Sequence, residues 1–257
     1  MAKIRVANTD HKTVQLYEVI RIIDGIPLFL EDHLDRLYHS ARLTGMDLLP
    51  GPVSLSGKIK KYVTSQMLET GNIKLAFSFS DQISGPQFEL NVVPHYYPAR
   101  EEYTNGVKVG LMYADRPVPN AKVQQTDIRD QANKLISDNH LFEVLLIDSD
   151  GNITEGSRSN VFFIKNETLF SAPANKILEG ITRNKVLQIC EKARINVIGS
   201  AIPANTLDQY EAVFLTGTSP KVLPVCSIEK IVYKTDLPLL VTLQVLYNQL
   251  LDDYLHR

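Results

Sequence analysis

The 257-residue sequence has few cysteines, no excess of either charge and no long hydrophobic run. Its two cysteines, Cys190 and Cys226, have no histidine partners at metal-ligand spacing, which argues against a disulfide framework and a structural zinc site. The net charge of -2 argues against a nucleic acid partner. Because no segment reaches the roughly 20 apolar residues that span a bilayer, and no export signal is found, we expect a cytoplasmic protein.

The first half of the chain predicts a mixed α+β unit. Strand-forming residues on both sides of Asp24-Gly25 predict a β-hairpin over residues 14–30, and apolar residues at helical spacing predict a helix over residues 31–46. Further segments are predicted as a helix over 54–69 and strands over 73–79, 88–93 and 107–113.

A passage with two prolines over residues 113–121 predicts a domain boundary, because proline resists regular structure. We therefore expect a small N-terminal domain over 1–114, a linker over 115–121 and a larger domain over 122–257. Within the larger domain we predict helices over 124–141, 183–193 and 239–255, and hairpins over 144–154 and 161–170.

Three dispersed motifs in the second half indicate a pyridoxal phosphate site. Gly180–Arg183 precedes a helical pattern and Thr216–Pro220 follows an apolar strand, so both could bind a phosphate, while Glu155 lies among small residues that leave room for a flat ring. Taken singly, they are more typical of a helix N-cap, a plain turn and a solvated carboxylate. The cofactor needs such phosphate donors, a carboxylate for its ring nitrogen and an amine for its aldehyde.

The amine must belong to a lysine, because only this side chain forms an imine with an aldehyde. Lys134 lies in a polar helical segment and is expected to face water. Lys122 follows the proline-containing passage, and burial near other cations would lower its pKa. The local sequence alone leaves both lysines open.

Five ordered motifs resemble the class IV, fold type IV family of pyridoxal phosphate enzymes, which includes branched-chain and D-amino acid aminotransferases and aminodeoxychorismate lyase. They lie at residues 17–21, 31–41, 153–161, 177–183 and 217–224, and the similarity covers most of the chain. The resemblance implies an α+β fold with two domains: a small N-terminal α/β sandwich, and a larger β-barrel-like domain with flanking helices.

The resemblance also implies roles for individual residues. Lys122, 33 positions before Glu155, matches the Schiff-base lysine, and Glu155 matches the partner of the pyridinium nitrogen. The other implied roles are ring packing for Leu178, phosphate binding for Arg36, Ile181, Thr182 and Thr218, and a substrate contact for Tyr17.

The chain departs from the family pattern in three places. It lacks the family's opening strand, it has Val123–Asp127 where an asparagine commonly follows the lysine, and it shows no counterpart of the arginine and histidine pair that binds the substrate carboxylate in D-amino acid enzymes. The arginines left as candidates for that carboxylate are Arg21, Arg100, Arg116 and Arg158.

We expect a pyridoxal 5'-phosphate-dependent aminotransferase that moves an amino group between an amino acid and a 2-oxo acid through Lys122. The first alternative is an aminodeoxychorismate lyase-type elimination of pyruvate to give 4-aminobenzoate. The second is a catalytically decayed homologue that still binds the cofactor. The resemblance implies a homodimer, small-molecule substrates and no metal.

Overall fold

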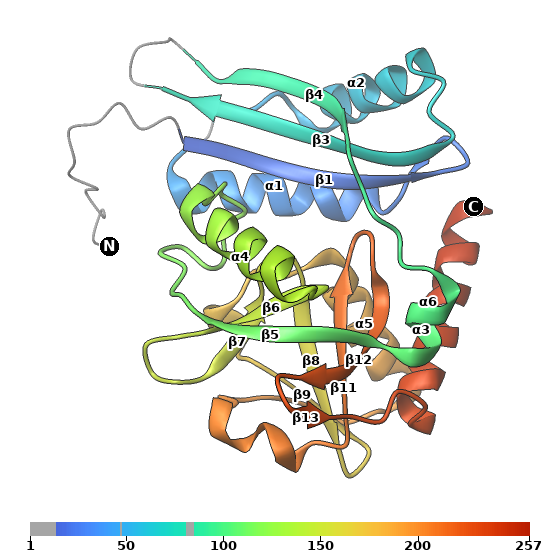
Figure 1. The fold of residues 1–257 in the computed structure, drawn as a ribbon. Coiled ribbons are helices and arrows are strands. Elements are labelled where there is room, and N and C mark those ends of the chain that lie inside the picture. The colour runs from blue at the N-terminus through green and yellow to red at the C-terminus, as the bar shows by residue number, and fades with distance from the viewer. Residues whose placement is uncertain (1–13, 47, 81–84) are drawn as a thin grey trace.

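The computed structural model describes residues 14–46, 48–80 and 85–257 and arranges them in two β-sheets with helices packed against each (Figure 1). Residues 1–13 lie outside the described ranges. The expectations of no export signal and no opening strand concern these residues. None of the helices in these ranges is long and apolar enough to cross a membrane.

The first sheet has four antiparallel strands in the order β2-β1-β3-β4. Its elements are β1 (Val14–Ile23), β2 (Ile26–Pro27), α1 (Leu30–Thr44), α2 (Pro52–Ser65), β3 (Thr70–Phe79) and β4 (Gln87–Val93). The predicted hairpin at Asp24-Gly25 and both predicted helices are confirmed, although β2 has only two residues because the chain turns at Phe29 into α1.

Alternating residues of β1 face opposite sides of the first sheet, as expected for a strand. Leu16, Ile20 and Ile22 are fully buried in the core that α1 and α2 form with the sheet. The intervening residues Tyr17 and Val19 line a cavity that also contains residues of the second sheet. The sheet therefore presents one face to its own helices and the other to the rest of the molecule.

The second sheet contains nine strands, with β10-β9-β8-β11-β12-β5-β6-β7 as its main path and β13 paired to β12. Its strands are β5 (Val107–Tyr113), β6 (Glu143–Ile147), β7 (Ile153–Gly156), β8 (Asn160–Lys165), β9 (Thr168–Ser171), β10 (Val197–Gly199), β11 (Ala212–Gly217), β12 (Lys221–Ile228) and β13 (Ile231–Val232). Strand β7 lies at one end of this path and β8 near the other end, yet only a three-residue turn joins them. The sheet must therefore curl to bring its two ends together.

Both faces of the curled sheet are buried, so its central strands are continuously apolar. On β8, Val161 and Phe163 belong to the inner core, whereas Phe162 and Ile164 pack against the flanking helices α5 (Ile181–Ala193) and α6 (Pro238–Leu255). A further helix, α4 (Thr126–Asn139), packs on β5 and β6. The predicted α+β fold class and the three predicted helices of this region are confirmed.

The chain passes between the two sheets before the predicted linker. Residues 94–99 connect β4 to the short helix α3 (Arg100–Asn105), and β5 then pairs with β12 and β6 of the second sheet (Figure 1). Strand β5, predicted as part of the N-terminal domain, thus contributes to the second sheet. The division into domains at residues 115–121 stays a prediction.

Candidate active site

Two adjoining cavities lie between the sheets. The smaller is lined by all eight residues that the sequence indicated, namely Tyr17, Arg36, Lys122, Glu155, Leu178, Ile181, Thr182 and Thr218. The larger, of about 710 Å³, shares six lining residues with it, namely Tyr17, Lys122, Arg129, Arg158, Ser159 and Thr218. Residues from α1, the segment after the proline-containing passage, β7, the start of α5 and the end of β11 therefore meet at one place.

Lys122 is positioned by main-chain hydrogen bonds to the first sheet and α1. Its carbonyl accepts a hydrogen bond from the Tyr17 N–H at 3.2 Å, and its own N–H donates to Ser40 Oγ at 3.0 Å. The next residue, Val123, forms an isolated antiparallel bridge with Leu16. Lys134 is exposed on α4, as expected for a residue that faces water.

The Lys122 side chain lies beside the ring of Tyr17, with Nζ 4.8 Å from the ring centroid. Burial lowers the pKa of the Lys122 amine, and the charges of Arg36 and Arg116 lower it further. The charge of Lys122 in turn lowers the pKa of the Tyr17 hydroxyl, against the opposing effect of burial. A lowered pKa increases the fraction of Lys122 in the nucleophilic, neutral form.

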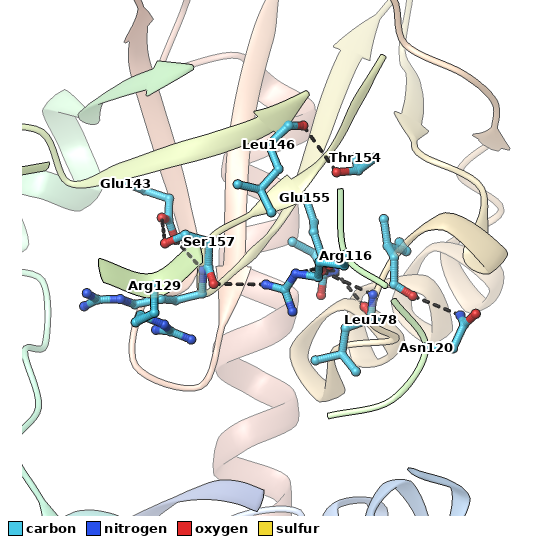
Figure 2. Close-up of polar contacts among 12 residues, drawn as sticks. Arg116, Asn120, Arg129, Glu143, Leu146, Thr154, Glu155, Ser157 and Leu178 are labelled. Carbon is cyan, nitrogen blue, oxygen red and sulfur yellow. Dashed lines mark hydrogen bonds and ion pairs between the residues drawn. The ribbon is translucent and has the colours of Figure 1, made fainter. Parts of the chain in front are cut away.

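Glu155 is buried near the end of β7 and is only partly hydrogen-bonded (Figure 2). Its Oε2 accepts hydrogen bonds from the Leu178 N–H and from Asn160 Nδ2, both at 3.2 Å. Arg116 Nε lies 3.1 Å from Oε1 but lacks hydrogen-bond geometry, so Oε1 has no hydrogen-bond partner among the described residues. Burial raises the pKa of Glu155 to about 7, although Arg116 and the Leu178 N–H oppose this rise.

Arg36 is held by a second buried carboxylate, that of Glu18 on β1. Arg36 Nε and Nη2 donate to its two oxygens at 2.8 and 2.6 Å, and His33 Nδ1 lies 2.7 Å from Oε2. Burial alone would raise the pKa of Glu18, but the Arg36 charge and these hydrogen bonds hold it at about 2. The third Arg36 nitrogen, Nη1, donates to the Glu179 carbonyl at 3.3 Å, beside the start of α5.

Helix α5 begins at the smaller cavity without a side-chain cap. Its N-cap is Gly180, and a Cβ added there would lie 2.1 Å from Asn160 Oδ1, so only glycine fits this close approach. The first N–H groups of a helix have no partner within the helix, and they carry a partial positive charge. Ile181 and Thr182, both buried, are the first two residues of this helix.

The end of β11 provides hydroxyl groups on the same side. Thr218 Oγ1 contacts the Val19 carbonyl at 3.4 Å. Thr216 is buried, and its Oγ1 has no hydrogen-bond partner within the described part of the chain. Together with the start of α5 and Arg36, these residues form a part of the cavity that is rich in hydrogen-bond donors.

The four arginines left open by the sequence have different surroundings. Arg116 contacts Glu155 and donates to the Ser157 carbonyl at 3.0 Å, Arg21 lies 3.8 Å above the ring of Tyr97, and Arg100 and Arg158 are exposed. Only Arg116 and Arg158 among them line the smaller cavity.

Sequence reasoning missed Asn160 and Arg129. Asn160 follows Glu155 within the same motif, and its contact with Glu155 could have been anticipated because a tight turn joins β7 to β8. Arg129 lines both cavities from α4, but it lies in a polar helical segment that gave no local signal.

Comparisons with known proteins agree with this arrangement. Residues 15–228 match the family model of class IV aminotransferases. The chain is 31% identical over 229 residues to D-alanine aminotransferase of Bacillus licheniformis, covering 83% of this chain and 78% of the relative.

Two solved structures share the fold. A branched-chain aminotransferase from the archaeon Thermoproteus uzoniensis, solved with norvaline, superposes with a TM-score of 0.80 at 23% identity, covering 92% of this chain and 85% of that one. The 4-amino-4-deoxychorismate lyase of Pseudomonas aeruginosa superposes with a TM-score of 0.81 at 21% identity, covering 93% and 90%.

The chain therefore belongs to the class IV aminotransferase family and is an enzyme of that family. The resemblance inferred from its five motifs is confirmed, as is the fold type.

Proposed function

We propose that the chain is a pyridoxal 5'-phosphate-dependent aminotransferase that exchanges an amino group between an amino acid and a 2-oxo acid. One observation carries the proposal: the Lys122 amine, buried Glu155, whose Oε1 has an ion-pair contact with Arg116 but no hydrogen bond among the described residues, and the uncapped start of α5 line the same cavity. These groups suit the aldehyde, the ring nitrogen and the phosphate of this cofactor, respectively.

The residues present fit the cofactor, and each has a distinct part in holding it. In this proposal Lys122 binds the aldehyde carbon, Glu155 pairs with the ring nitrogen, Leu178 packs on the ring face, and Arg36, Ile181, Thr182 and Thr218 bind the phosphate. Asn120 supports the arrangement, because its Nδ2 donates to the carbonyls of Ala174 and Ile177 at 2.7 and 3.0 Å. These contacts fasten the loop that leads to Leu178 to the segment that precedes Lys122.

When bound, pyridoxal phosphate supplies an aldehyde for amine exchange and an electron-poor ring that stabilises negative charge at the substrate α-carbon. The chain's own residues then move the protons. With the cofactor bound, Lys122 Nζ would act as the general base toward the proton on the substrate α-carbon and, once protonated, as the general acid. Its lowered pKa suits this role, since an ammonium group with an ordinary pKa holds its proton near neutral pH.

A lyase reaction of the aminodeoxychorismate type is the second candidate. The larger cavity, of about 710 Å³, offers more room than a small amino acid requires. Product analysis separates the candidates: transamination yields a 2-oxo acid from an amino donor with 2-oxoglutarate, whereas the lyase yields pyruvate and an aminobenzoate from aminodeoxychorismate. A coloured protein with neither activity would favour the decayed homologue. We also propose a homodimer, which gel filtration tests, and the cytoplasmic location stays a prediction.

Lys122→Ala tests the proposal. We expect the variant to lose borohydride-fixable attachment of the cofactor and to lose activity by roughly 10²–10⁴-fold or more, because covalent capture and proton transfer use the same amine. Absorption spectra and an assay with 2-oxoglutarate measure the two effects. Lys134→Ala on exposed α4 is the matched control and should retain both properties. Retention of attachment and activity by Lys122→Ala would contradict the proposal.

A further inference from the structure

The smaller cavity is unusually rich in cationic side chains. Those that line it are Arg36, Arg116, Lys122, Arg129 and Arg158. Arg36 is paired with Glu18 and Arg116 with Glu155. Among the described residues, the guanidinium groups of Arg129 and Arg158 have no carboxylate within ion-pair distance, and these two differ in their exposure.

Arg158 is exposed, and its guanidinium donates to the side-chain oxygen of Asn133. Arg129 is half-buried, and its side-chain hydrogen bond within the described ranges is a long one, from Nη2 to Tyr17 Oη at 3.5 Å. In Figure 2 no dashed line joins its guanidinium to another residue drawn. A half-buried guanidinium that lines a cavity with so few acceptors has donors left for an anionic ligand.

The acidic side chain that influences Arg129 is Glu143, which is already occupied. Glu143 is buried and accepts from Ser157 Oγ at 2.7 Å, Ser159 Oγ at 2.9 Å, and the Arg158 and Val144 N–H groups at 3.1 and 2.9 Å. These four hydrogen bonds fill the acceptor sites of a carboxylate. Glu143 therefore does not serve as the missing partner of Arg129.

Tyr17 connects Arg129 to the reactive lysine. Lys122 Nζ lies 4.8 Å from the Tyr17 ring centroid, and the Tyr17 hydroxyl faces Arg129. Both Arg129 and Lys122 also line the larger cavity. In an amino acid the carboxylate is one bond away from the α-carbon that reacts at the lysine, so its binding group must lie close to that amine.

We propose that Arg129, assisted by the Tyr17 hydroxyl, binds the carboxylate of the amino acid substrate. The inference rests on the proposed function and extends it to the choice of substrate class: α-amino acids in preference to simple amines. It also offers a replacement for the arginine and histidine pair that the sequence lacks. The planar guanidinium suits bidentate contact with a carboxylate, and its half-buried position limits competition from water.

The test compares substrates with and without the carboxylate. Holoenzyme is assayed with D-alanine and ethylamine, and with L-leucine and 3-methylbutylamine, against 2-oxoglutarate. We expect Arg129→Gln to lower kcat/KM for the amino acids by roughly 10–150-fold, the usual effect of losing a hydrogen bond to a charged group, and to lower kcat/KM for the amines, which have no carboxylate, much less. Arg129→Lys should lose less, because it keeps the charge without the fork. Lys134→Gln, at an exposed position of the same helix, is the control.

Direct binding covers the case in which none of these donors reacts. Calorimetry with propionate and 4-methylpentanoate should show binding to the holoenzyme that Arg129→Gln weakens by a similar factor. An unchanged ratio of amino acid to amine rates, or unchanged carboxylate affinity, in a variant that keeps its visible absorption would overturn the inference while leaving the proposed function intact. A wild-type protein that binds no cofactor would instead refute the proposed function itself.

Discussion

Glu18 on the first sheet and Glu155 on the second are both buried carboxylates, and the two have opposite protonation behaviour. Glu18 on β1 receives hydrogen bonds from Arg36 and contacts His33, and its pKa falls to about 2. Glu155 on β7 has one oxygen without a hydrogen-bond partner among the described residues, and burial raises its pKa to about 7. Both side chains are at most 3% exposed, so burial alone does not explain the difference.

The contrast supports the proposal that Glu18 is a structural carboxylate and that Glu155 pairs with the cofactor. A buried charge is stabilised only when its hydrogen-bonding capacity is filled. The protein itself fills that capacity for Glu18, whereas at Glu155 the capacity is partly open and suits a cationic group. Perturbed acids in a cavity are typical of functional sites, and the oxygen without a hydrogen bond supports the role proposed for Glu155.

The largest expected effect on stability comes from removing the partner of Glu18. Arg36→Ala should lower the free energy of unfolding by about 3–5 kcal/mol, because it leaves a buried carboxylate uncompensated. Urea unfolding measures the loss. Arg42→Ala, an exposed arginine on the same helix, should change it by no more than about 0.5 kcal/mol. If Arg36→Ala and Arg42→Ala lowered the free energy of unfolding by equally small amounts, the distinction between Glu18 and Glu155 would be contradicted.

A smaller effect of opposite sign is expected at Glu155. Its folded pKa of about 7 lies above the usual 4.5, so the folded protein binds the extra proton between these values and loses stability as pH rises through them. Glu155→Gln should therefore stabilise the cofactor-free protein by about 3 kcal/mol above pH 7, with the gain vanishing below about pH 4.5. Unfolding titrations at several pH values measure this; a pH-independent difference would show that the carboxylate is not perturbed.

The smallest effect concerns a single neutral donor at the phosphate end. Thr218→Val should weaken cofactor binding about five-fold, since one hydrogen bond contributes roughly 1 kcal/mol. Fluorescence titration of the cofactor-free protein measures the dissociation constant. Thr64→Val on α2 is a control because Thr64 donates to the Lys60 carbonyl of its own helix, away from the cavity. If Thr218→Val weakened cofactor binding as much as Arg36→Ala does, the result would contradict the proposal that Arg36 binds the phosphate through its charge.

Much of the fold could be predicted because its strands and helices have clear periodicity. The two hairpins of the second half, turning at Asp150-Gly151 and near Asn166, and helices α4, α5 and α6 lie where the sequence indicated. The sheet membership of β5 could not be predicted, because pairing with β12 depends on residues more than a hundred positions away. A proline-containing passage predicts irregular backbone but not the point at which the chain moves from one sheet to the other. Here the chain enters the second sheet at β5, before the prolines.

The site was predictable where the motifs are local and not where contacts cross the fold. The sequence could group Glu155 with the phosphate-binding candidates, but the choice of Lys122 over Lys134 came from the family resemblance. The role of Glu18 as the partner of Arg36 depends on β1 packing against α1, which no spacing rule reveals. Arg129 on α4 could not be predicted for the same reason, because its place in the site depends on contact with Tyr17 on the first sheet.

The main-chain attachment of Lys122 to β1 and α1 has a mechanical consequence. The Lys122 main chain is hydrogen-bonded to Tyr17 on β1 and Ser40 on α1, with Asn120 of the same segment bonded to the loop before Leu178, whereas the acid at position 155 lies on the curled sheet. Their spacing is thus a property of how the two halves are seated on each other. A substitution that shifts this seating would misalign amine and acid while leaving each half correctly folded, so lesions far from the cavity can abolish turnover without unfolding the protein.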